Sequence, residues 1–456
     1  MTKTLFSLIP PPLRSICIIA LILSLCACSL VNDLSSERAS LSFTITGELA
    51  DRINSASSSR SATLADSGLY LDIALEGGYK DEKTISVSEG STVKFENIPT
   101  GLSVYATAQA YEMDGGEKFV FYEGESEKIT IQEGENTLSL FLQKVESDII
   151  RYYISANGSA NDSDGSKAKP FKQLANAVEK INDSTKTYWL IVDGILSEPQ
   201  SLVDTLEDMA GKEIVLKGKT GSSTDIINAN AEGCALRINS PVPVTIKNLT
   251  ITGGDASNDV PKYGGGIYLI SGNVTIADGA VIVDNQAQNG GGVYMENSTT
   301  LKMTGGVITN NTASSMGGGV CLAQSQNTLF TMTGGEISNN TVTSGDGGGI
   351  WVGDWVEKIE LSNAKITGNK ADNGGGLSIG LTTSGTHKIS GCTISGNIAE
   401  TYGGGIYLQI GTLTINSSII SGNTAEQTNG NDIWKGMSAN LPNGPDDNPP
   451  NVYYAY

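Results

Sequence analysis

A glycine triplet that recurs at a near-constant interval constrains this chain more than any other feature. Gly-Gly-Gly begins at six positions 26, 27, 30, 27 and 29 residues apart, and an aliphatic residue follows each triplet. An Ile-x-x-Asn-x-(Ala/Val) motif recurs in phase with the triplets. Two motifs locked to one period indicate a repeat array. The triplets begin at Gly264, Gly290, Gly317, Gly347, Gly374 and Gly403, and the motif asparagines are Asn285, Asn311, Asn340, Asn369, Asn397 and Asn423.

Each repeat contains three short runs of alternating apolar residues, as in 292–295, 300–303 and 306–309. Such runs, bounded by Gly, Asn and Ser, are typical of strands, and no helical period separates them. One coil of this kind cannot bury its apolar face alone and must stack on its neighbours. The sequence therefore predicts an all-β fold, a parallel β-helix with three strands per coil. About eight coils would make a rod roughly 40 Å long.

The two motifs have separate structural roles. Glycine tolerates positive φ and lets backbones approach closely, so the triplet suits a tight corner before a strand. Asparagine also tolerates the left-handed region, and its side chain bonds nearby backbone groups. We therefore expect the six asparagines to stack as a structural ladder along the rod, in preference to binding a ligand.

The paired motifs, over about residues 249–434, resemble the repeats of polymorphic outer-membrane proteins. In that family Gly-Gly-Ala-(Ile/Leu/Val) accompanies Phe-x-x-Asn, whereas here Gly replaces Ala and Ile replaces Phe. The resemblance implies a β-helical, surface-exposed adhesin.

The start of the rod carries a second resemblance. Residues 152–171, followed by the helix-spaced run Gln173–Ile181, look like the opening segment of secreted right-handed β-helix proteins of the pectate-lyase-like group. The resemblance implies right-handed coils. A helix over 173–181 would cap the open end of the solenoid, whose strand edges are otherwise unpaired.

The N-terminus has the pattern of a bacterial lipoprotein. Lys3 and Arg14 precede an apolar run that is too short to span a bilayer, and the run ends Leu-Cys-Ala-Cys28. The pattern resembles a lipobox, which implies a signal peptide over 1–27 and acylation of Cys28 by groups such as palmitate; ordinary signal cleavage nearby is the alternative. Because Ser29 is not acidic, the resemblance favours the outer membrane. We expect a lipid-anchored protein of the bacterial cell envelope that faces outward.

Three further segments complete the predicted organisation. Residues 28–38 read as a lipidated tether, and 39–146 show period-two alternation with frequent turns, which predicts a small antiparallel β-sandwich. A corner near 93–101 resembles the prealbumin-like and Cna-B-like sandwiches. The β-helix is expected over 147–435, and the proline-containing tail over 436–456 leaves it.

Charge and residue counts exclude several functions. The formal net charge is −20, and without residues 1–27 it is 27 − 49 = −22, so nucleic acid is not an expected partner. Cys234, Cys321 and Cys392 have no paired spacing, so neither a disulfide framework nor a metal site is predicted. The one histidine, His387, lies in a loop-like stretch and is expected at the surface, which leaves serine and cysteine triads without a base. No cofactor motif is present.

A polysaccharide-cleaving enzyme is the principal alternative function, because the opening segment resembles such enzymes. Their chemistry needs a pair of carboxylates, or a calcium-bound uronate with a basic residue. The acids that lie near the repeat corners do not pair at equal phase, and no catalytic residue is assigned. These acids are Asp284, Asp346, Asp372 and Glu400, while Asp255 and Asp259 lie in a loop.

One surface feature is in phase with the repeat. The second residue after each triplet should point out of the β-helix, because the aliphatic residue before it points in. Four of these six residues are aromatic: Tyr268, Tyr294, Trp351 and Tyr407. They could stack along the rod for stability alone, or form an exposed strip that binds a glycan or a host protein. We expect surface binding or adhesion; a secreted lyase or hydrolase and a purely structural envelope protein are the alternatives. The oligomeric state is open.

Overall fold

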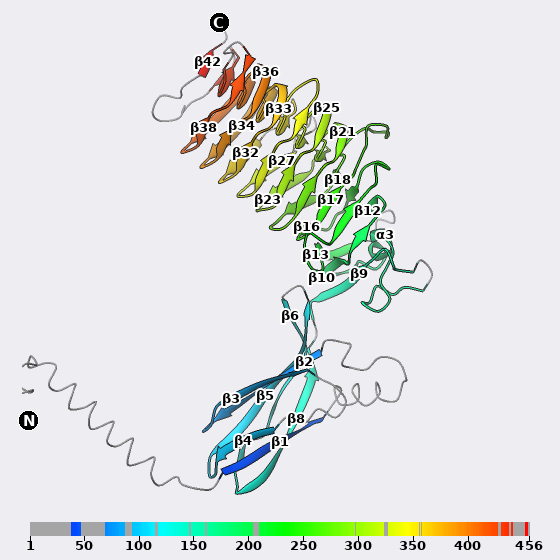
Figure 1. Ribbon diagram of the computed structural model, residues 1–456, viewed down its shortest axis with the longest axis vertical. Coiled ribbons are helices and arrows are strands. Elements are labelled where there is room, and N and C mark those ends of the chain that lie inside the picture. Colours follow the sequence, from blue (N-terminus) through cyan, green and yellow to red (C-terminus); the bar gives the residue numbers. More distant parts are fainter. Residues whose placement is uncertain are drawn as a thin grey trace, which may run out of the picture. The chain divides into compact units, whose positions relative to one another are not determined.

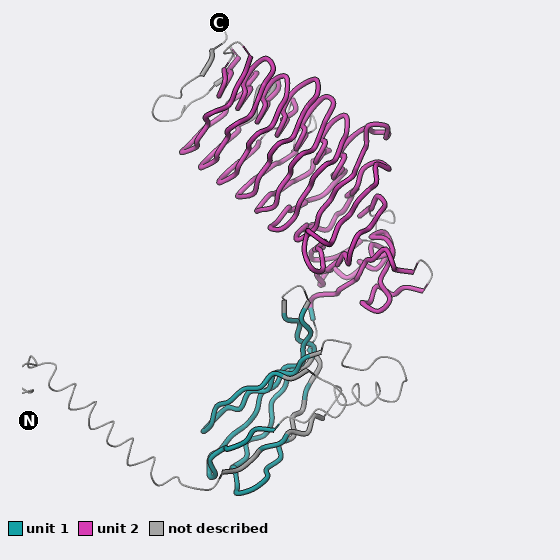
Figure 2. Tube along the Cα trace, viewed as in Figure 1, with its two compact units in different colours: residues 1–147 teal, residues 148–456 magenta. Residues whose placement is uncertain are grey.

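The structure is a computed structural model with two compact units, Met1–Ser147 and Asp148–Tyr456, which Figure 2 distinguishes by colour. Residues 1–37, which contain the predicted signal peptide and Cys28, lie outside the described part. The described residues are 38–46, 69–86, 94–114, 117–145, 147–159, 162–203, 209–296, 298–322, 327–354, 356, 358–426, 430–436, 439–440 and 452–454.

The first unit is a predominantly antiparallel sheet, in the strand order β3-β2-β5-β6-β8-β1-β4, with β7 paired to β5. Only β1 and β8 run parallel among the described pairs. The strands are β1 (Arg38–Thr46), β2 (Leu69–Gly77), β3 (Asp81–Ser86), β4 (Lys94–Pro99), β5 (Ser103–Asp114), β6 (Glu117–Ser126), β7 (Ile129–Thr130) and β8 (Gly134–Lys144).

This sheet curls around its own apolar core. Leu71, Ile73 and Leu75 alternate along β2 and pack against Phe95 of β4. The two edge strands also approach each other, since the Lys83 ammonium of β3 lies 5.0 Å from the centre of the Phe95 ring. The predicted antiparallel region is therefore present as one hydrogen-bonded sheet that folds over on itself.

The second unit is a right-handed parallel solenoid whose coils stack along one axis (Figure 1). Its largest sheet, here called the double-column sheet, carries two strand columns. The first column is β12 (Gln200–Val203), β15 (Leu236–Asn239), β18 (Ile267–Ser271), β22 (Val293–Met295), β26 (Val320–Leu322), β30 (Ile350–Val352), β34 (Leu377–Ser390), β37 (Ile406–Asn416), β40 (Ile433–Lys435) and β42 (Val452–Tyr454). The second column is β9 (Ile149–Ile154), β10 (Asn182–Val192), β13 (Ala210–Gly218), β16 (Val244–Lys247), β19 (Asn273–Ile276), β23 (Thr300–Met303), β27 (Leu329–Met332), β31 (Lys358–Ser362), the later parts of β34 and β37, and β41 (Ala439–Asn440).

Two further parallel sheets run along the solenoid, the shorter of them from Gln286 onward. The nine-strand sheet is β11 (Ile195–Leu196), β14 (Ile226–Asn228), β17 (Thr250–Thr252), β20 (Val281–Val283), β24 (Val307–Thr309), β28 (Glu336–Ser338), β32 (Lys365–Thr367), β35 (Thr393–Ser395) and β38 (Ile419–Ser421). The six-strand sheet is β21 (Gln286–Asn289), β25 (Thr312–Met316), β29 (Thr341–Val342), β33 (Lys370–Asn373), β36 (Ile398–Tyr402) and β39 (Thr424–Ala425).

The predicted parallel β-helix is thus confirmed, with one difference in strand count. The three predicted runs correspond to the two columns of the double-column sheet and to the nine-strand sheet. The fourth strand of a coil lies in the segment that follows each motif asparagine, where Ala and Val alternate with polar residues. Its shortness and low apolar content explain why sequence periodicity missed it.

Residues in register across the coils form the solenoid core. The aliphatic residue after each triplet pairs with its equivalent in the next coil, and all are buried: Ile267, Val293, Val320, Ile350, Leu377 and Ile406. At the N-terminal end the short helix α3 (Leu174–Val178) packs Leu174 and Ala177 into the same core. The predicted capping helix is therefore present, shorter than the run 173–181.

Candidate functional site

The six motif asparagines form a continuous hydrogen-bonded column inside the solenoid. In each coil the side-chain Nδ2 and the backbone N–H of one asparagine both donate to Oδ1 of the next, as Asn311 does to Asn340 at 2.9 Å. Nδ2 also donates to an isoleucine carbonyl of the preceding coil, as Asn340 does to Ile308 at 3.0 Å. Because both amide hydrogens and the amide oxygen are engaged, this asparagine column has no capacity left for a ligand.

The glycine triplets are packed against the asparagine column. The first glycine adopts a positive φ, 72° at Gly347. A Cβ on the third glycine would lie 2.5–2.6 Å from a carbonyl oxygen of the next coil, and at Gly319 it would lie 3.0 Å from Nδ2 of Asn340. A side chain at either position is therefore strained or excluded. The two motifs share one period because their atoms touch in every coil.

An altered triplet ends the column. Gly430-Asn431-Asp432 occupies the triplet position of the last full coil, and the N–H of Ile406 donates to the carbonyl oxygen of Asp432. The Asp432 carboxylate replaces a seventh asparagine, since it accepts both the Nδ2 and the backbone N–H of Asn423, at 2.8 and 3.2 Å. Sequence analysis missed this seventh copy because only its first glycine is retained.

A second column runs along the outward side of the first strand column. We call it the outer column; it contains the second residue after each triplet: Tyr268, Tyr294, Cys321, Trp351, Ser378, Tyr407 and Trp434. The residues that directly precede the glycines form a facing column, here called the pre-glycine column: Tyr263, Asn289, Met316, Asp346, Asn373 and Tyr402.

Of the two alternatives for the aromatic residues of the outer column, stacking or an exposed strip, the exposed strip does not fit three of the four. Tyr268, Tyr294 and Trp351 point away from the main core, but each is only 7–8% exposed. They form a separate apolar cluster with Ala287 of the six-strand sheet, which covers them. Tyr407 is half-buried. The alternation of inward and outward residues correctly predicted that these side chains point out of the β-helix. The strand that covers them belongs to the six-strand sheet, which the sequence did not predict.

The N-terminal half of the outer column is closed by internal contacts. The Tyr263 ring stacks on Tyr294 at 4.2 Å, and Tyr268 meets Tyr294 edge to face at 5.9 Å. The Tyr268 hydroxyl donates to the Glu296 carboxylate at 2.6 Å. Burial, followed by this bond to Glu296, raises the pKa of Tyr268. The polar tip of Tyr268 is therefore held by the protein itself.

The C-terminal half of the outer column contains a gap and then a stack of rings. Ser378 lies in register between Trp351 and Tyr407, so the column has no ring in that coil. Beyond the gap the rings of Tyr407 and Trp434 stack at 4.6 Å with 16° between their planes. Tyr402 of the pre-glycine column contacts Trp434 at 5.2 Å. All three rings are half-buried, so this half meets solvent more than the other.

Polar groups without partners concentrate around the gap. Among the described residues of these two columns, the buried side-chain polar atoms without a hydrogen bond are Ser378 Oγ, Asn373 Oδ1 and Trp434 Nε1 in this half and Asn289 Oδ1 in the other. The Nδ2 group of Asn373 donates to the Asp346 carboxylate at 2.8 Å. Burial raises the pKa of Asp346. Native structures satisfy most buried polar groups, so this concentration marks the gap as the candidate ligand site.

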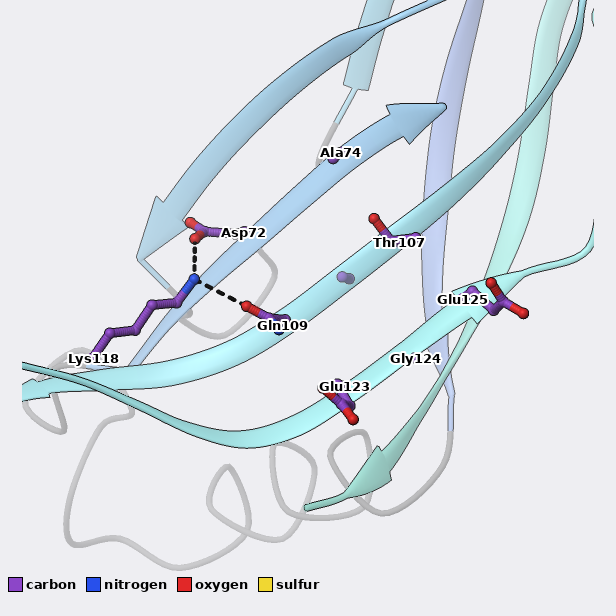
Figure 3. A pocket seen from close by; sticks show the side chains of 9 residues that line it. Asp72, Ala74, Thr107, Gln109, Lys118, Glu123, Gly124 and Glu125 are labelled. Atoms are coloured by element: carbon purple, nitrogen blue, oxygen red, sulfur yellow. Dashed lines mark hydrogen bonds and ion pairs between the residues drawn. The ribbon is translucent and has the colours of Figure 1, made fainter. Parts of the chain in front are cut away.

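A different hollow, of about 420 Å³, lies on the outer face of the first unit (Figure 3). It forms over the small side chains of Ala74 and Thr107, between longer polar residues of β2, β5 and β6. Lys118 spans its edge and binds Asp72 at 2.7 Å and Gln109 at 3.1 Å. Because Asp72, Gln109 and Lys118 bind one another, the hollow gives less indication of a ligand than the gap does.

His387 is buried, contrary to the surface position expected from the sequence. It lies in β34 between exposed Thr386 and Lys388 and pairs in register with Leu413 of the core. Burial lowers its pKa to about 4, so the side chain is neutral at pH 7. The signal that sequence analysis overlooked is the alternation of His387 with Ile389.

The three cysteines of the solenoid are buried and free. Burial raises the pKa of the Cys234 thiol to about 12, which makes it a poor nucleophile. Within the described ranges no cluster of three or more His, Cys, Asp or Glu side chains could hold a metal ion. The same ranges contain no helix of sufficient length and hydropathy to cross a membrane.

Comparison with known proteins supports the fold. The model of the family described as "Right handed beta helix region" matches residues 233–399 and 307–440, the part that contains all six triplets. No curated protein and no solved structure matches the chain. The chain therefore carries a right-handed β-helix repeat, and the residues themselves must indicate its function.

Proposed function

We propose that this chain is a lipid-anchored bacterial envelope protein, held by acylated Cys28 at the outer membrane, whose solenoid binds a surface glycan or a host protein. The observation that supports binding is the C-terminal half of the outer column. Half-buried Tyr402, Tyr407 and Trp434 form a ring cluster there, beside buried polar atoms that lack partners. Aromatic rings beside a few convergent polar groups are typical of ligand sites.

The regularity of the solenoid also supports a scaffold that presents a fixed surface. The asparagine column and the triplets leave each coil little freedom, so side chains on the outer face keep constant spacing. A site on rigid strands loses less conformational entropy on binding than a site on mobile loops. The first unit, in this proposal, separates the solenoid from the membrane.

The test is a binding screen of the purified full chain against glycans and extracellular-matrix proteins. We expect saturable binding to at least one glycan or protein class, and loss of that binding when the chain is heat-unfolded. The anchor is tested separately by mass spectrometry of the N-terminal peptide, with the Cys28→Ala variant as control. An absence of saturable binding across the screen would contradict the binding role.

The same samples distinguish binding from cleavage. Acidic and neutral polysaccharides are incubated with the chain, with and without calcium, and the release of reducing or unsaturated sugars is measured. The binding role predicts no release above that of the heat-unfolded chain. Catalytic release would replace the binding role by the polysaccharide-cleaving alternative.

A further inference from the structure

We infer that the hollow on the outer face of the first unit is a docking surface for a basic segment of a partner protein. A lysine or arginine side chain of that segment would extend over Ala74 and Thr107 and end at the carboxylates of Glu123 and Glu125. This inference goes beyond the proposed function, because it concerns the first unit and does not depend on what the solenoid binds.

The hollow forms because small side chains lie between longer ones on the outer face of the sheet (Figure 3). Ala74 of β2 pairs in register with Thr107 of β5, and Thr107 pairs with Glu125 of β6. Residues in register share one face of a sheet, so these three side chains lie in one row across the strands. Ala74 and the methyl group of Thr107 give the hollow an apolar floor, which suits the aliphatic stem of a lysine or arginine.

One wall of the hollow is already neutralised. The Lys118 ammonium lies 2.7 Å from the Asp72 carboxylate and donates to Gln109 Oε1 at 3.1 Å. Asp72 also accepts hydrogen bonds from the hydroxyl groups of Thr84 at 2.6 Å and Tyr111 at 3.0 Å. Among the described residues that line the hollow, Lys118 is the one base. Its charge is balanced by Asp72, so the other carboxylates of the hollow are left without a counter-charge.

The opposite wall carries this unbalanced negative charge. Glu123 and Glu125 lie two residues apart on β6, and both are exposed and line the hollow. Neither carboxylate has an ion-pair partner in the described part of the first unit. A third exposed acid, Glu82 of β3, stands in register with Ala74. The hollow is therefore bordered by carboxylates that a cationic partner would complement.

A basic side chain fits both the floor and the wall. Its aliphatic stem covers Ala74 and Thr107, and its ammonium or guanidinium group pairs with an exposed carboxylate. A metal ion would leave the apolar floor uncovered, and the described residues of the hollow do not form a cluster that could hold one. The formal charge of −20 attracts further basic residues of the same segment, so binding should weaken as salt is raised.

The test is fluorescence anisotropy of labelled arginine-rich and lysine-rich peptides with the purified full chain; a glutamate-rich peptide of equal length is the probe of opposite charge. The double variant Glu123→Gln/Glu125→Gln removes charge at the hollow. Its matched control is Glu133→Gln/Glu135→Gln, which removes the same charge at the same spacing from exposed positions that do not line the hollow. We expect the first pair to weaken basic-peptide binding about tenfold and the control pair less than about twofold.

A further variant separates the shape of the hollow from its charge. Thr107→Tyr fills the floor with a ring, leaves the charge unchanged and places a residue that suits a strand. We expect it to weaken basic-peptide binding about fivefold or more, in a chain whose thermal unfolding stays cooperative. If Thr107→Tyr does not unfold cooperatively, Ala74→Tyr takes its place, because it fills the same floor from β2.

Several results would overturn this inference. They are an absence of basic-peptide binding at low salt, equal losses in the two glutamate pairs, unchanged binding by the variant with the filled floor, and tighter binding of the glutamate-rich peptide. Tighter binding of an amino-sugar oligomer than of either basic peptide would also overturn it, because the partner would then be a glycan. Each outcome leaves the proposed function standing, since every variant keeps the solenoid unchanged.

Discussion

The asparagine column and the outer column cross the same coils at the same spacing, yet their chemistry differs. In the asparagine column every amide has its partners, and the same residue recurs in six coils until Asp432 ends the series. The outer column changes from tyrosine to cysteine, tryptophan and serine, and near Ser378 its polar atoms lack partners. Within the described residues, the asparagine column, which stabilises the rod, repeats one residue type. The candidate ligand site lies instead in the outer column, whose residue types vary.

This difference has a physical basis. A ladder of identical side chains is cooperative, because each amide bond polarises the next and one defect leaves several groups unpaired. Outward-facing side chains are coupled to the coils mainly by stacking, so most of them can vary without breaking a hydrogen bond; the bond from Tyr268 to Glu296 is an exception. The outer column therefore tolerates a residue without a ring at Ser378, whereas the asparagine column tolerates no such change.

Replacement of a central asparagine should have the largest effect. Asn340→Ala leaves the backbone and side-chain N–H groups of Asn311 without their shared acceptor, and the Ile308 carbonyl without its donor. Buried unsatisfied groups of this kind should lower the free energy of unfolding by about 4 kcal/mol. Urea unfolding followed by circular dichroism measures the change.

The matched control is Asn373→Ala in the pre-glycine column. Its side chain donates a single bond, to Asp346, so we expect a loss of only about 1 kcal/mol. Equal losses of stability at Asn340 and Asn373 would show that the asparagine column stabilises the rod no more than the pre-glycine column does.

Acidic pH should destabilise the core of the solenoid, where His387 is buried. Burial lowers the pKa of His387 to about 4, below its ordinary value of 6.5, so the unfolded chain binds a proton more readily than the folded chain. Stability present above pH 6.5 is therefore lost as the pH falls toward 4, by roughly 3 kcal/mol for this one group.

The His387→Leu variant tests this acid sensitivity. It should flatten the dependence of the melting temperature on pH between 6.5 and 4, relative to the unmodified chain. An unchanged pH profile in the variant would place the acid-sensitive group elsewhere.

Substitution of one tyrosine in each half should distinguish the N-terminal half of the outer column from the C-terminal half. Tyr294 is only 7% exposed, so Tyr294→Ala should cost about 3 kcal/mol of stability. Tyr407 is half-buried, so Tyr407→Ala should cost about half as much stability as Tyr294→Ala. Differential scanning calorimetry ranks the two variants, and the opposite ranking would reverse the assignment of the halves.

The smallest effect concerns Asp346. Burial raises its pKa above the ordinary value of 3.8, so the ionised carboxylate costs stability at neutral pH and this cost disappears as the pH falls through the raised pKa. Asp346→Asn should therefore stabilise the chain by under about 1 kcal/mol at pH 7. The gain in melting temperature should shrink toward pH 4, and a gain that grows on acidification would contradict the assigned shift.

Much of the architecture followed from sequence periodicity. The triplets and asparagines predicted stacked parallel coils, and the aliphatic residue after each triplet lies in the core as expected. Period-two alternation also gave the outward direction of Tyr268 and Tyr294. These features are local, because a side chain's direction depends on its own strand.

Other features depended on segments distant in the chain. The cover over Tyr294 comes from the six-strand sheet, and the partner of Tyr294 is Tyr263, thirty-one positions earlier. The burial of His387 depends on strands of neighbouring coils. The sequence alone therefore determined the repeat, the stacking and the direction of each side chain. Only the tertiary structure decided which outward residues meet solvent, because exposure depends on what other coils place above a residue.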